Sequence, residues 1–337
     1  GTTNPPSPPP HSPLALIRDI LGGRKLDRQQ LLSLASDETD LNGLLYGANL
    51  LRQHFRGNTV DLCSLVNAKS GNCAEDCSFC AQSAHHAAGA KAHPMIGFPE
   101  IKRCYMKAQK MGASRFDIVT SGNELSAGEL NFVVDSIASL RKMKSARIPL
   151  CASIGRLSVE QAKRLKDAGL VRCHHNIETS GRFFPGICTT HSFDERLETA
   201  RNIKAAGLEL CCGGVMGMGE TWEDRVDMAL TFRELGADAV PLNFLIPVKG
   251  TRLESQSAME PKEILRTIAL FRYALPEKDV RLCGGRERNL RDMQSWIFHA
   301  GANAMMIGGY LTQRGRRPED DLQMLKDLGL EAAMGGR

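Results

Sequence analysis

The sequence repeats one short unit, in which a helix that ends at a glycine is followed within a few residues by an apolar, strand-like run. Examples are KAQKMGAS before RFDIVTSG and NIKAAGL before ELCCGGVMG. Strands that alternate with helices predict parallel strand pairing. Glycine suits the left-handed end of a helix because it has no Cβ, and the glycines in question are Gly112, Gly169, Gly207, Gly236 and Gly301.

Eight strand candidates can be counted along the chain. They lie at residues 60–69, 115–120, 147–154, 171–179, 209–215, 239–247, 279–285 and 304–309. Eight strands joined by helices are what a closed (β/α)8 barrel of the TIM type requires. No GxGxxG turn, which marks many doubly wound sheets, follows the first strand. We therefore predict an α/β chain folded as a (β/α)8 barrel, with a doubly wound open sheet as the alternative.

The segments outside the strand repeats have patterns of their own. Residues 1–14 are rich in Pro, Ser and Thr, which predicts a disordered tail. Residues 15–58 have the pattern of helices, and we expect this N-terminal helical extension to cap the lower end of the barrel. The barrel is then expected over residues 59–330, with a C-terminal tail at 331–337.

Composition excludes several classes of function. The net charge is only +5, from 43 basic and 38 acidic residues that are dispersed along the chain, so a nucleic-acid partner is not expected. There is no apolar run of membrane length and no secretory signal peptide. We expect a cytoplasmic protein without a membrane partner. Eleven cysteines in such a chain indicate metal or redox chemistry more than disulfides.

Three of these cysteines lie in the stretch SGNCAEDCSFC, directly after the first predicted strand. Cys73, Cys77 and Cys80 have CxxxCxxC spacing, and they fall at the C-terminal face of the barrel, where active sites lie. A structural zinc site needs four ligands, so zinc would also require His85 or His86. The other interpretation is a four-iron cluster with three protein ligands, which leaves one iron open to a cofactor.

The spacing, with an aromatic residue before the third cysteine, resembles the signature of the radical S-adenosylmethionine (SAM) family. The resemblance implies that Cys73, Cys77 and Cys80 hold a 4Fe-4S cluster whose open iron is chelated by SAM. It implies that reductive cleavage of SAM releases a 5′-deoxyadenosyl radical. Phe79 matches the aromatic position that packs near the adenine.

Over residues 40–330 the chain is also similar to the biotin synthase family. This resemblance implies radical-dependent insertion of sulfur into dethiobiotin, with the sulfur drawn from an auxiliary iron–sulfur cluster. It implies a homodimer, an electron donor such as flavodoxin or ferredoxin, and iron–sulfur assembly proteins as partners. Another radical SAM enzyme, of mutase or cluster-maturation type, and a zinc-stapled binding protein are the alternatives. The similar segments are SGNCAEDCSFCAQS, HHNIETS, CCGGVMGMGET, VPLNFLIPVKGT, VRLCGGRE and AGANAMMIGG.

The resemblance carries roles to matching positions. Asn176 and Asn243 match the asparagines that hold the ureido ring of dethiobiotin. Glu178 matches an acidic residue, commonly Asp, that binds the ribose of the nucleoside, and Val215 and Ile246 match apolar positions that flank the adenine. Strand alternation puts Asn176 and Glu178 on the same face of one strand, which supports a shared site.

One position departs from the family pattern. The familiar auxiliary two-iron cluster is held by three cysteines and one arginine, at positions that are here Asp117, Cys151, Cys211 and Arg281. A carboxylate is a poorer partner than a thiolate for an iron–sulfur cluster. The usual site is therefore damaged, or it holds a different cluster.

Barrel geometry suggests a replacement ligand set. Interior side chains form layers of four that alternate strands supply, and four cysteines fall on the odd-numbered predicted strands. We call Cys63, Cys151, Cys211 and Cys283 the cysteine layer. We predict that it holds a larger auxiliary cluster, favoured as four-iron. A two-iron cluster that uses Asp117 or Cys283 is the alternative, and four cysteines that act only as small apolar residues are a third possibility.

The other cysteines are assigned no chemistry. Cys212 is expected to face a helix because its neighbour Cys211 matches an inward ligand. Arg281 shares a face with Cys283, two residues on, so Arg281 and Arg115 are expected to be polar interior residues near the auxiliary cluster. Three cysteines are interpreted as structural or incidental, namely Cys104, Cys173 and Cys188.

Overall fold

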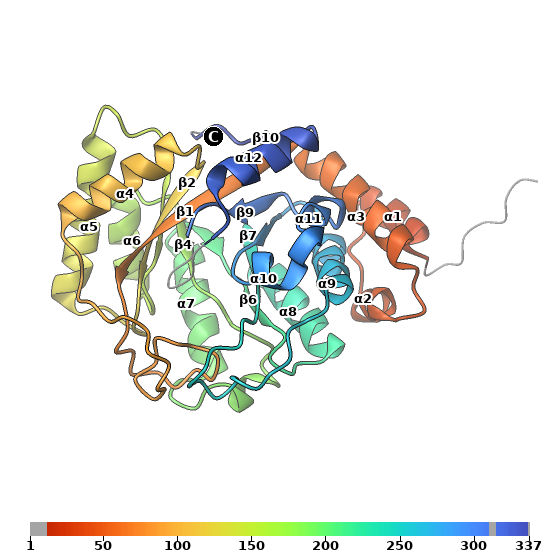
Figure 1. Ribbon diagram of the computed structural model, residues 1–337, viewed down its shortest axis with the longest axis horizontal. Helices are drawn as coiled ribbons and strands as arrows, with labels where there is room; N and C mark the ends of the chain where they lie inside the picture. The colour runs from red at the N-terminus through yellow and green to blue at the C-terminus, as the bar shows by residue number, and fades with distance from the viewer. Residues whose placement is uncertain (1–11, 310–314, 336–337) are drawn as a thin grey trace, which may run out of the picture.

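The computed structural model describes residues 12–309 and 315–335 (Figure 1). The helices are α1 (Pro13–Leu21), α2 (Arg28–Ala35), α3 (Leu41–Arg56), α4 (Phe98–Lys110), α5 (Ala127–Lys142), α6 (Val159–Ala168), the turn η1 (Phe184–Gly186), α7 (Phe193–Ala205), α8 (Trp222–Glu234), α9 (Pro261–Ala274), α10 (Arg286–Leu290), the turn η2 (Arg291–Met293), α11 (Trp296–His299) and α12 (Pro318–Asp327). The strands are β1 (Thr59–Lys69), β2 (Arg115–Thr120), β3 (Leu150–Ser153), β4 (Arg172–His174), β5 (Glu209–Cys211), β6 (Gly214–Met216), β7 (Ala239–Phe244), β8 (Asp279–Leu282), β9 (Ala304–Met306) and β10 (Glu331–Ala332).

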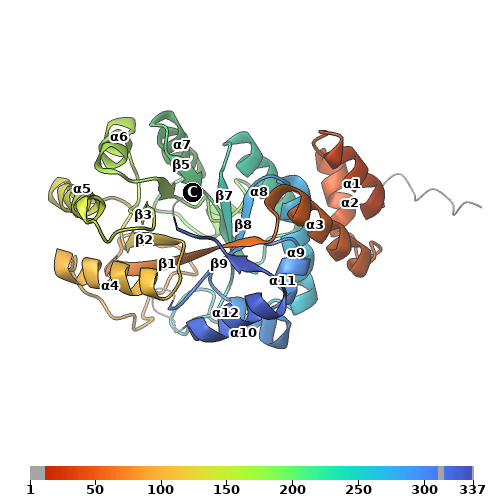
Figure 2. The same ribbon diagram turned by 90° about the horizontal axis from the view of Figure 1, so that it is seen from above.

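The strands form a parallel sheet that closes on itself. The pairing order is β1, β2, β3, β4, β5, β7, β8 and β9, and β9 returns to pair with β1. β5 and β6 both pair with β7 and are two parts of one barrel strand. Figure 2 shows the helices arranged around this ring of strands. The predicted (β/α)8 barrel is confirmed, and the doubly wound alternative is wrong.

One predicted strand, at residues 209–215, is split into β5 and β6. Two glycines lie at the break, where neighbouring backbone comes too close for any side chain. A Cβ on Gly213 would lie 1.9 Å from the carbonyl oxygen of Pro241, and one on Gly214 would lie 2.3 Å from that of Glu178. The CCGG sequence is therefore a requirement of close packing between strands.

Helix starts are fixed by local side-chain chemistry. At α5, α6, α7 and α8 a Ser or Thr accepts a hydrogen bond from the backbone three residues on, and the side chain at that position bonds back to the cap. The glycine at the end of α6, Gly169, has φ 107°, as the left-handed cap requires. The four capping residues are Ser126, Ser158, Ser192 and Thr221.

Helices α1–α3 form a second layer outside the barrel. They pack against α8 and α9 on the outer side (Figure 2), and not across the lower end as expected. The reason lies in α9, in which every residue from Ile264 to Ala274 is buried. A helix that is buried all round needs a cover on its outer face as well.

The chain ends differ from the expected boundaries. The predicted tail at 1–14 lies mostly outside the described residues, but Ser12 caps α1, which already begins at Pro13. At the other end β10 pairs in parallel with the start of β1 at Thr59 and Val60, so the expected C-terminal tail begins with a strand. Among the helices that the structure describes, none has the length and apolar character needed to cross a membrane.

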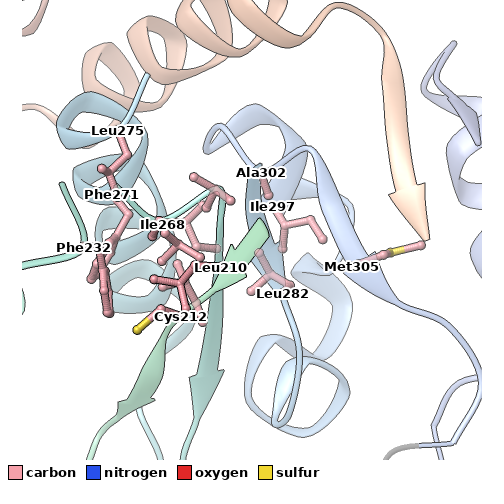
Figure 3. Packing of buried hydrophobic residues seen from close by; sticks show 14 of the residues in the cluster. Leu210, Cys212, Phe232, Ile268, Phe271, Leu275, Leu282, Ile297, Ala302 and Met305 are labelled. Atoms are coloured by element: carbon pink, nitrogen blue, oxygen red, sulfur yellow. The ribbon is translucent and has the colours of Figure 1, made fainter. Parts of the chain in front are cut away.

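The main hydrophobic core lies between the strands and the surrounding helices. Figure 3 shows that Leu210 and Cys212 point to the side of the strands on which Phe232 of α8 lies. Cys173 belongs to the same core, and both cysteines are fully buried. The predicted direction of Cys212 toward a helix is confirmed, and alternation along the strand turns Cys211 toward the barrel interior.

Candidate active site

A cavity of about 350 Å³ lies within the barrel, toward the end where the strands finish. Of the residues predicted for the site, Cys151 alone is missing from its lining; it is buried on β3. The structure therefore brings residues from five barrel strands and the loops that follow them to one place. The predicted residues that line the cavity are Cys63, Cys73, Cys77, Phe79, Cys80, Asn176, Glu178, Cys211, Val215, Asn243, Ile246, Arg281 and Cys283.

The cysteine loop, residues 70–84, follows β1 and is shaped by its own backbone. The N–H of Cys73 donates to the carbonyl of Gln82 at 3.0 Å, and the N–H of Ala84 donates to the carbonyl of Cys73 at 2.7 Å. The N–H of Cys80 donates to the carbonyl of Cys77 at 3.0 Å. These bonds fold the loop back on itself and keep its three thiols beside one cavity, where they could hold a cluster with an open iron.

The two histidines after the loop are not arranged as zinc ligands. A ring nitrogen of His85 lies 2.9 Å from the carbonyl oxygen of Ala74, and one of His86 lies 2.9 Å from that of Cys80. Each histidine thus pairs with backbone, and neither lines the cavity. This arrangement does not support the zinc alternative built on these two residues.

The loop is held to the segment 187–191 by a buried carboxylate. Asp76 accepts hydrogen bonds from the N–H of Thr189 at 2.8 Å, from its hydroxyl at 2.7 Å and from the N–H of Thr190 at 3.3 Å. Burial alone would raise the pKa of Asp76, but these bonds outweigh it and hold the pKa well below its usual range. The clamp brings Cys188 to within 3.8 Å of Cys77 between the two sulfurs. Cys188 was predicted to be structural or incidental, and its buried place beside Cys77 agrees with the structural role.

Both predicted asparagines bind backbone at the break between β5 and β6. Asn176 Oδ1 accepts from the N–H of Gly213 at 3.0 Å, and Asn243 Nδ2 donates to the carbonyl of Gly214 at 3.1 Å. Asn176 Nδ2 also donates to the carboxylate of Glu178 at 3.3 Å. The two amides are thus fixed on neighbouring residues and face the same cavity.

Glu178 has an unusual backbone. Its φ is 67°, in the left-handed region that residues other than glycine rarely adopt. The N–H of Thr179 donates to the carbonyl of Ile177 at 2.9 Å, which closes a three-residue turn around Glu178. The carbonyl of Glu178 itself accepts from the N–H of Val215 at 2.8 Å. Such strain persists where the surrounding structure enforces it, often at functional sites.

An apolar cluster lies behind the cysteine loop. Phe79 packs against it from the loop, and Ile246 lines the cavity beside its last member. An apolar wall of this kind could accept the face of a planar base. The buried members are Cys77, Phe184, Ile187, Cys188, Val215, Met218 and Leu245.

The cysteine layer lies deeper in the barrel. Cys63 precedes the last residue of β1 by six positions, which is about 20 Å along an extended strand. Cys63 and Cys283 belong to one small buried cluster with Met306. Cys211 lies 3.4 Å from Nδ1 of His174, and Cys151 is nearby on β3. Burial raises the pKa of Cys211 to about 11 and of Cys151 to about 12, so both are protonated thiols until a metal replaces the proton.

Asp117 stands at the edge of this layer. It pairs with Cys151 across the β2–β3 register, and its Oδ1 has no hydrogen-bond partner in the described part of the chain. Burial raises the pKa of Asp117 to about 6, while the charges of His174 and Arg281 oppose the rise. The carboxylate therefore faces the thiols and is available to a ligand.

Three arginines surround the cysteine layer. Arg115 and Arg281 both bind Asp61, at 2.6 and 2.7 Å, and Arg172 binds Glu209 at 2.7 Å. Their predicted interior position is confirmed for Arg115 and Arg281, which are buried. Arg172 and Arg281 each keep one buried nitrogen without a hydrogen-bond partner among the described residues, and the corresponding nitrogen of Arg115 has only an ion pair with Glu209 at 3.8 Å. Buried donors are nearly always satisfied in native proteins, so these nitrogens fit an anionic occupant such as a thiolate-bound iron–sulfur cluster.

Sequence reasoning missed several residues that line the cavity. Thr120 Oγ1 and His175 Nε2 are buried there without a partner in the described structure. Arg196 of α7 brings a cation to the same space. His174 shares its strand face with Asn176, so period-two alternation could have found it.

The chain matches two family models. Residues 68–232 match the Radical SAM superfamily, and residues 241–331 match the Biotin and Thiamin Synthesis associated domain. In fold it is similar to methylornithine synthase (PylB), with TM-score 0.82 and 20% identity over 94% of this chain and 97% of that one. It is also similar to the FeFe-hydrogenase maturase HydG from Carboxydothermus hydrogenoformans, with TM-score 0.81 and 16% identity over 96% and 79%. The fold and the site thus define a radical SAM protein.

Relatives similar over nearly the whole chain narrow this class. The biotin synthase of Geobacter sulfurreducens is 50% identical over 320 residues, which is 94% of this chain and 97% of that protein. The biotin synthase of Pelobacter propionicus is 49% identical over 319 residues, with the same shares covered. The chain belongs to the biotin synthase family, radical SAM enzymes that insert sulfur, as the sequence predicted. Membership implies a 4Fe-4S cluster with SAM and an auxiliary cluster.

Proposed function

We propose that the chain converts dethiobiotin to biotin, and that its auxiliary iron–sulfur cluster is held by the four thiolates of the cysteine layer. The observation that carries this proposal is one cavity lined both by the cysteine loop and by Cys63, Cys211 and Cys283, with Asn176 and Asn243 in the same lining. A source of radicals and a source of sulfur would then face the same substrate-sized space.

Cys73, Cys77 and Cys80 are the proposed ligands of the 4Fe-4S cluster. When bound, this cluster with SAM supplies a 5′-deoxyadenosyl radical, and the auxiliary cluster supplies the sulfur atom. The protein excludes water around the loop with the apolar cluster behind it, in which Cys77 is buried. Family membership also makes a small one-electron protein such as flavodoxin or ferredoxin the expected reductant.

The nucleoside of SAM is expected to lie between the apolar wall and Glu178. Val215, Ile246 and Phe79 offer apolar contacts to the adenine, and the carboxylate of Glu178 can accept hydrogen bonds from ribose hydroxyls. Arg196 lines the same cavity and is suited to the carboxylate of SAM, because a guanidinium pairs with a carboxylate through two parallel hydrogen bonds.

Asn176 and Asn243 are proposed to orient the ureido ring of dethiobiotin. A primary amide offers two N–H donors and an oxygen with two lone pairs. Asn176 uses one N–H on Glu178 and one lone pair on Gly213. Its second donor and second lone pair can therefore serve the ring, while the backbone contacts keep the side chain in one orientation.

The cysteine layer supplies four thiolates, which is the number that normally binds a four-iron cluster. Its surroundings support this, because Arg115, Arg172 and Arg281 offset the negative charge of thiolates and sulfides. A two-iron cluster with Asp117 as a ligand is the second candidate. The observation in its favour is the unpartnered Oδ1 of Asp117.

Counts of iron and labile sulfide after anaerobic reconstitution separate the two candidates. The four-iron proposal expects about eight irons per chain, falling to about four in Cys63→Ala/Cys283→Ala. Cys173→Ala/Cys212→Ala is the matched control, since it also removes two buried cysteines but from the helix side, and it should keep about eight. Equal counts in the parent and in Cys63→Ala/Cys283→Ala would overturn the proposal.

Activity is tested by anaerobic incubation with dethiobiotin, SAM and a reductant. We expect biotin together with 5′-deoxyadenosine. The Cys63→Ala/Cys283→Ala variant should still release 5′-deoxyadenosine, because the cysteine loop is untouched, but it should form no biotin. Normal release of 5′-deoxyadenosine without biotin in the parent would point to another substrate.

A further inference from the structure

We propose that the chain carries a second metal site, for a single divalent ion of the borderline-soft class such as Zn²⁺ or Fe²⁺. Its ligands are Cys188 and His191, with Cys77 shared from the cysteine loop. The site forms only while the loop holds no iron–sulfur cluster, since Cys77 cannot serve both. This inference does not depend on the proposed substrate.

The three ligand atoms already have the spacing of a tetrahedral site. The sulfurs of Cys77 and Cys188 are 3.8 Å apart, Cys188 Sγ is 3.3 Å from Nδ1 of His191, and all three ligand atoms lie within 4.8 Å of one another. With metal–sulfur bonds of about 2.3 Å and metal–nitrogen bonds of about 2.0 Å, a tetrahedron requires about 3.8 Å between sulfurs and about 3.5 Å between sulfur and nitrogen. An ion would therefore fit with little movement of the protein.

A fourth ligand is at hand. Oε2 of Glu75, in the cysteine loop, lies 2.5 Å from Nδ1 of His191, and zinc accepts carboxylate oxygen along with sulfur and nitrogen. Metal binding at Nδ1 replaces the hydrogen bond between this nitrogen and Glu75, and the ring proton is then on Nε2. The 2.9 Å bond from Arg196 to Nε2 then breaks, and Arg196 is free to turn into the cavity that it already lines.

The site is prearranged by contacts that do not involve its ligands. The hydrogen bonds of Asp76 to Thr189 and Thr190 fix the segment that carries Cys188 and His191. Cys77, Cys188 and His191 are all buried, so few water molecules compete for the ion. Burial and a fixed backbone favour a metal site because less order is lost on binding.

The site has a consequence for the enzyme. A cluster-free chain would hold one divalent ion on the middle cysteine of its loop, and that ion would have to leave before a 4Fe-4S cluster could form. Cys73 and Cys80 take no part in the single-ion site, and this difference makes the proposal testable.

The first test titrates Co²⁺ into the full-length, cluster-free protein under anaerobic, reducing conditions, and counts bound equivalents from thiolate-to-metal absorption. The cysteine layer can also bind Co²⁺, so the comparison is between variants. We expect Cys188→Ala and His191→Ala each to lose one equivalent per chain, while Cys73→Ala and Cys80→Ala lose none. Loss in Cys73→Ala or Cys80→Ala, with none in Cys188→Ala, would mean that the loop alone binds the ion and would overturn the proposal.

A second test measures whether the metal protects an individual ligand from chemical modification. Zn²⁺ should slow the alkylation of Cys188 by iodoacetamide in the parent but not in His191→Ala. Mass spectrometry of the peptide that contains Cys188 measures the rate. Cys104, which is half-buried on α4, is the control thiol and should react at the same rate with and without Zn²⁺. If Cys188→Ala disturbs the fold, Cys188→Ser replaces it, and circular dichroism checks that the variant is folded. An unprotected Cys188 in the Zn²⁺-loaded parent would refute the site.

Discussion

At the scale of single residues, Glu178 combines a candidate ligand group with a strained backbone. A φ of 67° costs a residue with a Cβ on the order of 1 kcal/mol or more. Glu178→Gly removes both the strain and the carboxylate, whereas Glu178→Ala removes only the carboxylate. We expect the glycine variant to have a free energy of unfolding about 1 kcal/mol higher than the alanine variant, measured by denaturant unfolding.

The same pair of variants tests the ribose contact. Both should weaken SAM binding by a similar factor, about 10- to 100-fold, since a hydrogen bond to a charged group contributes about 1.5–3 kcal/mol. Equilibrium binding of SAM to the reconstituted protein measures this loss. Unchanged affinity in both variants would mean that Glu178 does not touch the cofactor and that its strain has another origin.

Residue-level prediction from the sequence worked where strand alternation applies. The family resemblance gave the inward direction of Cys211, period two along the strand then gave the outward direction of Cys212, and the loop spacing gave the three cysteines after β1. Contacts between loops could not be found this way. Cys188 lies 111 positions after Cys77, and what joins them is the Asp76 clamp, a tertiary contact that no spacing reveals.

At the scale of elements, Asp224 ties the start of α8 to the loop after β4. Its carboxylate accepts from the hydroxyl of Ser180 at 2.6 Å and from the guanidinium of Arg182 at 2.8 Å. Burial alone would raise the pKa of Asp224, but these bonds outweigh it and lower the pKa to about 2. A depressed carboxyl pKa stabilises the fold above its ordinary value of 3.8, and this stabilisation is lost as the pH falls through about 2.

Asp224→Asn should therefore cost about 2 kcal/mol near neutral pH. The difference from the parent should shrink steadily between pH 5 and pH 2, because protonation removes the same charge in the parent. Unfolding of the cluster-free chain, followed by circular dichroism across this range, gives the measurement. Ser180→Ala should reproduce part of the loss; a difference that stays constant with pH would show that charge is not the cause.

The helix α12 is fixed by a buried ion pair. Arg286, at the start of α10, binds Asp321 of α12 at 2.8 and 3.1 Å, and their side chains are 2% and 1% exposed. Asp321→Ala leaves the guanidinium buried without its main partner, so we expect a loss of about 3–5 kcal/mol in unfolding free energy. Arg286→Met/Asp321→Leu should lose clearly less, since neither charge remains. Equal losses in the two variants would contradict this account.

Element boundaries were predictable where the signal is local. Terminal glycines marked the helix ends, because this motif acts within a few residues of the end of the helix. The break between β5 and β6 was not predicted, since it depends on Pro241 of β7 and Glu178 of the loop after β4 approaching Gly213 and Gly214. From the sequence alone the run 209–215 has the pattern of one continuous strand.

At the scale of the whole molecule, the eight-strand barrel followed from the repeat, but the position of α1–α3 did not. Their amphipathic pattern required an apolar partner without saying which one. The partner is the outer face of α9, whose residues from Ile264 to Ala274 are all buried. Gly47 of α3 lies against Tyr273 of α9, and a single added methyl group can test how closely the two layers pack.

Gly47→Ala would place a Cβ 1.9 Å from the hydroxyl oxygen of Tyr273 and 2.6 Å from Cδ1 of Ile17. Because no Cβ tolerates such distances, α3 or its neighbours must shift, and overpacking of this kind costs about 1–3 kcal/mol. Gly128→Ala is the matched control: it also lies in a helix, but nothing comes within 4 Å of the added Cβ. There, alanine should stabilise by about 0.5 kcal/mol through its better helix propensity. Denaturant unfolding of the two variants should therefore give changes of opposite sign, and a stabilising Gly47→Ala would mean that the outer layer does not press on α9 as closely as described.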